Sequence, residues 1–359
     1  MKRPSATEII PESDALEGAP HPRFAPRLIG HQRAELDLLN GYRTGRLPQA
    51  WIMGGRLGIG KATLAWRLAR FVLAYPDISA PEVQGAQDLS VPADHPVSKR
   101  INSLSHGDLA VLRRAYNDKT KRHFTEIRVD DVRKALEKFH HAAGEGGWRV
   151  AIIDCADELN KSSANALLKM IEEPPPRSLF LMISHQPAQV LPTIRSRSRM
   201  LMLPVLSAAE VLETIKGLVD PHDHDHAALA MAAERSGGSV REAMRLLDGK
   251  ALEVTSRIES ILKRLPNVDW KSVYLLSDVV CARDANDDFG STITAIYDWL
   301  DAEIRSRAGE GAARLAPLAE VWEKVAGSVR NAEALNLDKR ALLLSIFSDL
   351  SAASAAAQR

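Results

Sequence analysis

The chain has 359 residues, more than one ordinary hydrophobic core accommodates, and this length is typical of two or three domains. Its 45% hydrophobic and 26% charged residues are typical of a globular protein, and a net charge of +1 gives no indication of a nucleic-acid or anionic-membrane binder. The two cysteines, Cys155 and Cys281, are too far apart for a CxxC metal site. No apolar run has the ~18–20 residues that span a bilayer, and no signal-peptide core follows Lys2 and Arg3, so we expect a cytoplasmic protein without membrane contact.

Residues 1–22 are rich in Pro, Ser, Glu and Ala without a periodic pattern, which predicts a flexible N-terminal arm. We then expect a helix over 35–42, a short apolar strand over 50–53 and a helix over 62–74. The strand and the second helix flank a glycine-rich segment. A phosphate-binding P-loop requires this order of elements.

Residues 76–105 contain many Pro, Asp and Ser and predict a long loop or an insertion. Residues 127–129 predict a strand, and Asp130 is placed to cap a helix that runs to about Ala143. The segment 97–122 carries seven basic and two acidic side chains. It could face DNA or a partner subunit, and the default expectation is that it faces water.

Three apolar runs predict further strands. The run 150–153 ends in Asp154, the run 179–183 is equally apolar, and 200–203 is expected at an edge of the sheet. A continuously apolar run is typical of a parallel strand that helices cover on both faces. Strands that alternate with helices therefore predict an α/β parallel-sheet domain over residues 23–205.

The strand pattern stops after this domain. Helices are expected over 208–219, 226–235 and 239–248, and together they predict a small helical lid domain over residues 206–249. Residues 250–359 predict an all-α C-terminal domain, with helix breaks near Pro266, Gly290, Gly309–Gly311 and Asn336. Its Ala-rich end, 352–357, is expected to fray.

The glycine-rich segment, residues 55–62, reads Gly-Arg-Leu-Gly-Ile-Gly-Lys-Ala and matches the P-loop pattern G-x-x-x-x-G-K-[ST] except at its last position. Ala62 replaces the hydroxyl that binds Mg²⁺ in that pattern. The candidate phosphate-binding residues are Gly55, Gly58, Gly60 and Lys61. A second interpretation makes Lys61 a structural residue that caps carbonyls of the strand and loop. ATP binding is left open, and we expect no required cofactor.

Asp154 ends its strand where the Mg²⁺-binding carboxylate of a P-loop ATPase lies. The next residue of a working ATPase is a glutamate that polarises water, but here it is Cys155, which lacks the charge and basicity for that role. Asp157 and Glu158 are an alternative acidic pair, although we expect them on the following helix, turned away from the phosphates. Ala62 and Cys155 together predict that any bound ATP is not hydrolysed efficiently.

The helix over 163–173 carries the string N-A-L-L-K-M-I-E-E-P-P, followed by L-F-L-M-I-S and I-R-S-R-S-R. Periodicity alone fits an amphipathic helix with a proline stop. The ordered set of motifs from about Leu28 to Leu247 resembles the clamp-loader branch of the AAA+ ATPases. Within that branch, the chain resembles the delta-prime subunits of bacterial DNA polymerase III.

This resemblance implies a role for Arg197. Ser196-Arg197-Ser198 occupies the place of the family's Ser-Arg-Cys motif, whose arginine reaches the ATP of a neighbouring subunit as a trans finger. Ser198 departs from the family's cysteine. The alternative is a basic strip of Arg195, Arg197 and Arg199 on an extended segment, facing solvent or nucleic-acid phosphates.

The resemblance also implies two sensor residues. Ser184 ends a strand where the family has a polar sensor near the γ-phosphate, although a plain strand-end serine is equally consistent. Arg241 corresponds to the second sensor on the lid, or it makes an interdomain salt bridge. Many family members carry a four-cysteine zinc knuckle, and residues 80–106 contain no cysteine, so we expect no metal here. His95 and His106 are read as ordinary loop residues.

The resemblance implies a stator subunit that lacks productive ATPase chemistry. Its partners would be the gamma/tau and delta subunits, and through the complex the sliding clamp and primed DNA, at the cytoplasmic replisome. The alternative is an active gamma/tau-like motor ATPase, which requires a hydroxyl at position 62 and Glu at 155. A P-loop kinase and a free-standing DNA-binding protein are further alternatives from other classes.

Overall fold

The computed structural model describes residues 12–16, 18–140, 147–220, 222–282, 286–335 and 337–358. These residues form two compact units, one that ends at Met244 and one that begins at Arg245. The predicted lid helices α8 and α9 belong to the first unit, and α10 runs across its end.

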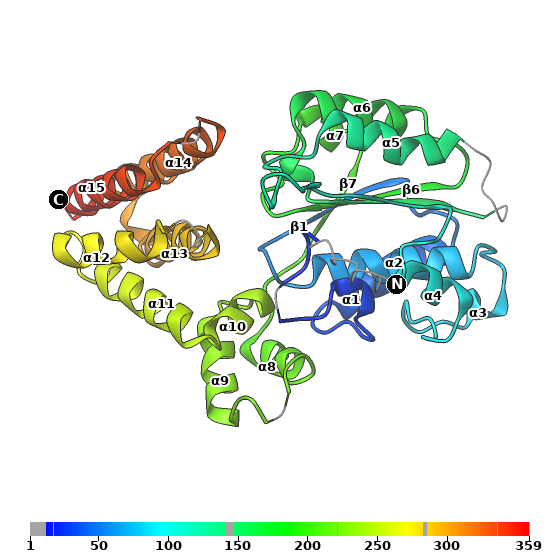
Figure 1. Ribbon diagram of the computed structural model, residues 1–359, viewed down its shortest axis with the longest axis horizontal. Helices are drawn as coiled ribbons and strands as arrows, with labels where there is room; N and C mark the ends of the chain where they lie inside the picture. The colour runs from blue at the N-terminus through cyan, green and yellow to red at the C-terminus, as the bar shows by residue number, and fades with distance from the viewer. Residues whose placement is uncertain are drawn as a thin grey trace, which may run out of the picture. The chain divides into compact units, whose positions relative to one another are not determined.

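A five-stranded parallel sheet forms the centre of the first unit, with the strand order β2-β5-β6-β1-β7. Helices α1 to α4 lie on one face of the sheet, and α5, α6 and α7 lie on the other (Figure 1). The prediction of an α/β AAA+ parallel-sheet domain is confirmed. The strands are β1 (Ala50–Gly54), β2 (Leu109–Leu112), β5 (Arg149–Asp154), β6 (Ser178–Ser184) and β7 (Arg199–Met202). The helices are α1 (Gln32–Arg43), α2 (Lys61–Ala74), α3 (Pro81–Gln84), α4 (Pro96–Asn102), α5 (Val129–His140), α6 (Lys161–Glu172) and α7 (Pro192–Arg195).

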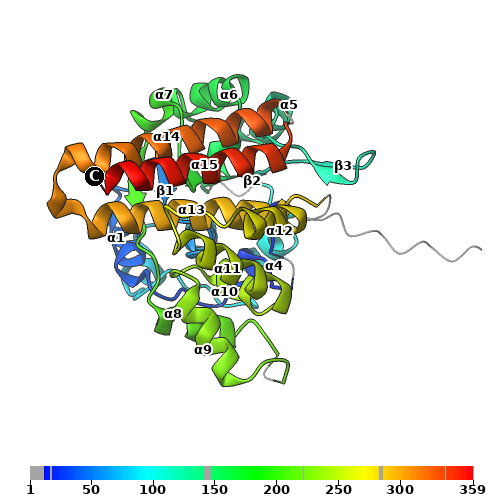
Figure 2. The ribbon, with the colours of Figure 1, turned by 90° about the vertical axis from the view of Figure 1, so that its left-hand side faces the viewer.

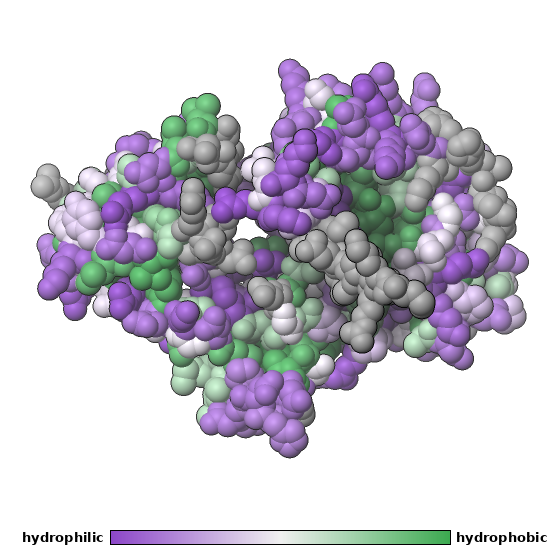
Figure 3. Space-filling view, viewed as in Figure 1, coloured by the Kyte–Doolittle hydropathy of each residue, from purple (hydrophilic) through white to green (hydrophobic). Residues whose placement is uncertain are grey.

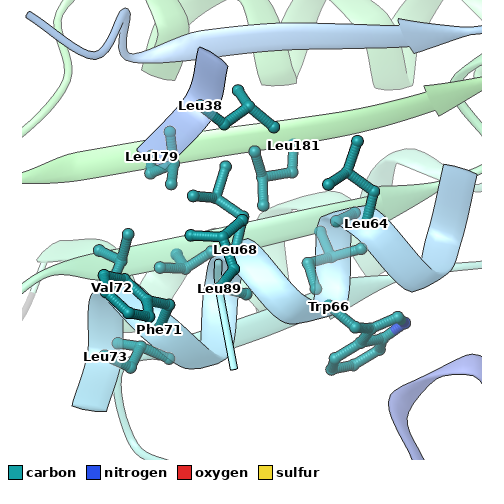
Figure 4. Close-up of a cluster of buried hydrophobic side chains, with 14 of the residues drawn as sticks. Leu38, Leu64, Trp66, Leu68, Phe71, Val72, Leu73, Leu89, Leu179 and Leu181 are labelled. Atoms are coloured by element: carbon teal, nitrogen blue, oxygen red, sulfur yellow. The ribbon is translucent and has the colours of Figure 1, made fainter. Parts of the chain in front are cut away.

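Two hydrophobic clusters hold the sheet between its helices. On the α2 side, Leu64, Leu68 and Phe71 meet Leu179 and Leu181 of β6 (Figure 4). On the opposite face of the sheet, a second cluster packs apolar side chains of α5 and α6 against side chains of β5 and β6. The outer surface over α5 and α6 is hydrophilic, as expected for helices that bury one face (Figure 3).

The structure corrects several expectations for residues 76–129. Residues 76–105 are not one long loop, because they contain α3 and α4, whose apolar side chains are buried. Strand β2 at the sheet edge and the small hairpin of β3 (Tyr116–Asn117) and β4 (Arg122–His123) were not predicted. The predicted strand 127–129 is a single bridge at Ile127, since α5 already begins at Val129. The predicted end of that helix, 141–143, lies outside the described residues.

The lid helices are confirmed. They are α8 (Ala208–Lys216), α9 (His226–Arg235) and α10 (Val240–Leu246). Ser207 and Glu210 form a reciprocal capping box at the start of α8, and Asp225 caps α9.

The regular elements among the described residues of the second unit are all helices (Figure 2), and their buried apolar side chains form one cluster. Gly290 does not break a helix, since it lies inside α13. The Ala-rich end does not fray, because α15 continues to Ala357, and Ala353 and Ala357 are buried. Among the described residues, α15 alone is long and apolar enough to span a bilayer, and its apolar side chains belong to the core of this unit. The helices are α11 (Gly249–Leu262), α12 (Trp270–Val280), α13 (Asn286–Ser306), α14 (Ala312–Leu335) and α15 (Lys339–Ala357).

Candidate functional site: a modified nucleotide pocket

The candidate residues from three strands meet at one edge of the sheet. Gly54 of β1 lies opposite Ser184 of β6, and Ile183 lies opposite Asp154 of β5. Because the strands are parallel, their carboxyl ends, and the loops that follow them, share this edge. A cavity of about 430 Å³ lies here, lined by the P-loop, the lid and residues near the N-terminus.

The P-loop glycines have conformations that other residues rarely adopt. Gly55, Gly58 and Gly60 have φ angles of 141°, 79° and 101°. A Cβ at Gly58 would also collide with Ser239 and Arg241 of the lid. The loop therefore needs glycine at these positions for its own shape and for its contact with the lid.

The side chain of Lys61 binds the backbone of its own loop. Its side chain is buried, and Nζ donates to the carbonyl oxygens of Gly55 at 2.6 Å and Arg56 at 2.5 Å. This is the contact that the structural interpretation of Lys61 requires. Burial lowers the pKa of Lys61 to about 8, while the nearby acidic groups raise it less.

Other donors bind the next carbonyls of the loop. Ser239 Oγ donates to Leu57 at 2.8 Å, and the backbone N–H of Val240 donates to Gly58 at 2.8 Å. The Nε2 atom of His31 lies 2.6 Å from the carbonyl oxygen of Ile59, which requires the tautomer with a proton on Nε2. The carbonyls of residues 55–59 are thus all bound within the chain, and the lid is fastened to the loop.

The carboxyl of Asp154 has a raised pKa. Burial raises its pKa to about 7, with Asp14 and Glu158 adding to the effect and Lys61 and Arg113 opposing it. Ala62 offers no hydroxyl beside it. A protonated or half-protonated carboxyl without that hydroxyl is a poor ligand for Mg²⁺.

Cys155 remains a thiol. It is buried, and its Sγ donates to Asp157 Oδ2 at 3.0 Å. Burial and the neighbouring carboxylates raise the pKa of Cys155 well above its ordinary value. A neutral thiol pointed at a carboxylate cannot take a proton from an attacking water.

Asp157 corrects the expectation that the second acidic pair turns away from the site. A short 3₁₀ turn follows β5, and it folds the Asp157 carboxylate back onto the end of β6. There it accepts from Ser184 Oγ at 2.5 Å and from the N–H groups of His185 and Gln186 at 2.5 and 3.1 Å. These contacts satisfy groups that the strand leaves unpaired, and they use the hydroxyl of Ser184.

Two groups of potential metal ligands occur among the described residues: Cys155, Asp157 and His185, and Glu12, Asp14 and His21. The Asp157 carboxylate of the first already accepts four donors. The carboxylates of the second pair with arginines. Hydrogen bonding and ion pairing explain both groups.

His95 and His106 have local roles. The Nδ1 atom of His95 accepts from the N–H of Val97, and the Nδ1 atom of His106 accepts from the N–H of Asp108. Each ring thereby satisfies a backbone donor at the start of a helix or turn.

Arg197 lies outside the pocket, in the turn after α7. Its side chain is 44% exposed, and its Nε lies 2.8 Å from Glu172 Oε1 at the end of α6. The alternative of an extended basic strip is wrong, because Arg195 ends a helix, Arg197 lies in a turn and Arg199 begins β7. Arg197 Nη1 also donates to the carbonyl of Thr193 and to Ser196 Oγ, both at 3.2 Å, so the side chain is held against its own turn.

Arg241 lies in the first turn of α10 and lines the pocket. Burial is the main cause that lowers the pKa of His185, and the charges of Lys61 and Arg241 lower it further. Arg241 thus contributes positive charge to the same end of the cavity as Lys61.

Sequence reasoning missed the N-terminal contribution to the site. Residues 12–16 and 18–22 were expected to belong to a flexible arm, yet Asp14, Leu16 and Pro20 line the cavity. The only signal was two acidic residues, Glu12 and Asp14, in a chain with the pair Arg113-Arg114 about a hundred positions away. No local pattern connects them.

The sheet order, the glycine loop after β1 and the helical lid define a P-loop domain of the AAA+ class. A family model described as "DNA polymerase III, delta subunit" matches residues 30–207. The delta-prime subunit of Pseudomonas aeruginosa is 32% identical over 252 residues, which are 70% of this chain and 69% of that protein.

Motor-type subunits are also similar to this chain. The gamma subunit of Buchnera aphidicola is 26% identical over 269 residues, covering 74% of this chain and 69% of that protein. The tau subunit of Salmonella typhimurium is 25% identical over 328 residues, and the match spans only 46% of its length. Among solved structures, Thermotoga maritima RuvB covers 80% of this chain and 86% of its own, with 18% identity and a TM-score of 0.40. The chain belongs to the DNA polymerase III clamp-loader family of AAA+ proteins.

Proposed function

We propose that this chain is a delta-prime-type stator of a DNA polymerase III clamp loader, a subunit that does not hydrolyse ATP itself. The observation that carries the proposal is the state of its own reaction centre. Ala62 lacks the metal-binding hydroxyl, Cys155 is a buried thiol, and Lys61 is bound to loop carbonyls. ATP is not required by this role, and any ATP that binds is held without turnover.

Arg197 is the residue that we propose acts on a neighbour. It is 44% exposed, lies in a turn between α7 and β7, and does not line the cavity of its own domain. A guanidinium stabilises the charge that develops on a transferring γ-phosphate, which is worth about 10³–10⁵ in rate in well-studied NTPases. In this proposal, Arg197 supplies that charge to the ATP of an adjacent gamma/tau motor subunit.

The rest of the chain has a supporting part in the proposal. The helical unit from Arg245 onward packs into a collar with the gamma/tau and delta subunits. The assembly opens the sliding clamp and places it on primed DNA in the cytoplasm. Ser184 and Arg241 keep the positions of sensors without a hydrolytic reaction to monitor.

The gamma/tau-like motor is the competing function, since gamma and tau relatives match the chain over a similar length. It conflicts with the chemistry of positions 62 and 155.

Replacing Arg197 tests the proposal. Arg197→Ala in the reconstituted loader should leave the complex intact by mass and lower its DNA-stimulated ATPase rate by roughly tenfold or more. Arg195→Ala is the matched control, since Arg195 is two residues away and its Nη1 donates to the carbonyl of Ala188. Equal ATPase rates for the Arg197→Ala and Arg195→Ala complexes would remove the trans-finger role.

A further inference from the structure

An acidic segment near the N-terminus is held against the phosphate end of the pocket. Asp14 Oδ1 accepts from Arg113 Nη1 at 2.7 Å, and Glu12 Oε1 accepts from Arg113 Nη2 at 2.8 Å. Glu12 Oε2 also accepts from Arg23 Nη1 at 2.5 Å, and His21 Nε2 lies 3.0 Å from Asp14 Oδ2. The side chain of Asp14 is only 2% exposed, so this is a buried contact and not a surface encounter.

The sheet and α2 supply the anchors of this segment. Arg113 directly follows β2 at the carboxyl edge of the sheet. His21 packs edge-on against Trp66 of α2, with ring centroids 5.6 Å apart. Arg70 of α2 donates to the carbonyl of Arg23. A charged bidentate pair at one end and a buried ring contact at the other fix the course of the chain between them.

The segment changes the charge of the pocket. Burial by itself would raise the pKa of Asp14, but His21 and Arg113 hold it below its ordinary value, so Asp14 carries a negative charge at neutral pH. Asp14 is close enough to Asp154 to raise its pKa. Asp14, Asp154 and Glu158 line the cavity together, at the end where Lys61 marks the phosphate position of a P-loop.

The two sequence departures in the reaction centre do not by themselves prevent binding. The hydroxyl replaced by Ala62 holds the metal, and the glutamate replaced by Cys155 acts on water. The P-loop glycines remain, and the cationic side chains of Lys61 and Arg241 still line the cavity, although Lys61 donates to loop carbonyls. A chain that excludes nucleotides would therefore need a further feature beyond these two replacements.

We infer that residues 12–16 are an intramolecular cover of the phosphate end, which excludes nucleoside di- and triphosphates by placing the Asp14 carboxylate where their charge would lie. The inference rests on the proposed function, because it explains how a subunit without turnover avoids trapping ATP. Arg113 and Arg23 hold the cover in place. Removing the carboxylate or its anchor opens the site to the anion.

Titration with a fluorescent ATP analogue, in EDTA and in Mg²⁺, tests the cover on the full chain. The variants are Asp14→Asn, which removes the charge, and Arg113→Gln, which removes the anchor. Glu126→Gln is the matched control, because Glu126 is an exposed acidic residue outside the cavity lining. Relief of one like charge beside the phosphates should tighten binding by about tenfold or more in the first two variants. The control should bind as weakly as the unmodified chain.

An Asp14→Asn affinity within about twofold of the control would overturn the cover. The same conclusion follows if no variant binds the analogue at all. Hydrogen–deuterium exchange of residues 12–22 gives an independent measurement that does not depend on ligand. Slow exchange in the unmodified chain, lost in Arg113→Gln while β1 and β6 stay protected, is the expected result. Fast exchange in the unmodified chain contradicts docking.

The outcomes separate the cover from the stator role. Tight binding by the unmodified chain without turnover removes the cover and leaves the stator. Turnover by the unmodified chain removes the stator. Binding that appears only in the variants, without phosphate release, supports both.

Discussion

Lys61 illustrates how one residue of a familiar motif has acquired structural contacts. It lies where a P-loop lysine reaches the phosphates, but its ammonium group binds the carbonyls of Gly55 and Arg56. Its lowered pKa, about 8, shows that burial makes its charge costly to keep. A residue bound in this way stabilises the empty loop.

Replacing Lys61 should therefore cost stability in the absence of any ligand. Lys61→Met leaves two part-buried carbonyls without their donor, which costs about 1–3 kcal/mol. The measurement is the free energy of unfolding of the first unit, taken from urea denaturation. Lys161→Met, at an exposed position, is the control and should be nearly neutral. A Lys61→Met chain as stable as this control would mean that the lysine is free for another partner.

Asp154 predicts a pH dependence. Its folded pKa, about 7, is above the unfolded value of about 3.8, so the folded state binds more protons between these values. Its contribution to stability is therefore greatest below about pH 4 and is lost as the pH rises to about 7.

Asp154→Asn should remove this dependence. The variant should be about as stable as the unmodified chain near pH 4 and more stable at pH 8, by on the order of 2–4 kcal/mol. The difference in free energy of unfolding across that range is the measurement. A difference that does not change with pH would show that the Asp154 carboxyl is not perturbed.

At the scale of elements, long apolar runs were the part of the fold that sequence could predict. Strands β1, β5, β6 and β7 and the lid helices lie where their patterns place them. Strand β2 was missed because its four residues lie inside a basic segment, and α4 because Pro96 occupies a first turn where proline is tolerated. Short elements of this kind are stabilised by their neighbours and not by a local pattern.

The candidate site was also only partly predictable from the sequence. The glycine loop, Asp154 and Ser184 could be located from motifs, and the structure brings them to one edge of the sheet. The contact of Asp157 with Ser184 and the ion pair of Asp14 with Arg113 could not be predicted from motifs, since each depends on the three-dimensional course of a loop. Whether Arg197 and Arg241 act as finger and sensor stays a prediction.

The end of α15 offers a test of the corrected C-terminal element. Ala353 is buried against the apolar core, whereas the adjacent Ala352 is exposed. Ala353→Asp buries an unpaired carboxylate and should destabilise the second unit by about 2–4 kcal/mol. Ala352→Asp carries the same change on the solvent side and should cost less than about 1 kcal/mol. Thermal unfolding followed by circular dichroism compares them, and equal losses would mean that this end is indeed frayed.

At the scale of the whole molecule, the chain consists of a P-loop unit and a separate helical unit. The first unit keeps a P-loop fold, but its loop carbonyls and its Cys155 thiol are bound within the chain, and burial raises the pKa of Asp154 to about 7. Arg197, which is 44% exposed and paired with Glu172, lies on the same unit. The second unit is a helical body with its own core. In the role that we propose, such a subunit contributes to a reaction that it does not carry out alone.

Magnesium-dependent phosphate release by the purified, isolated chain tests this account most directly. The account predicts a rate indistinguishable from buffer with Mg²⁺ and saturating ATP, at any pH at which the chain stays folded. Sustained release that disappears with EDTA and in a Lys61→Met variant would contradict it, because the chain would then be hydrolysing ATP at its own P-loop.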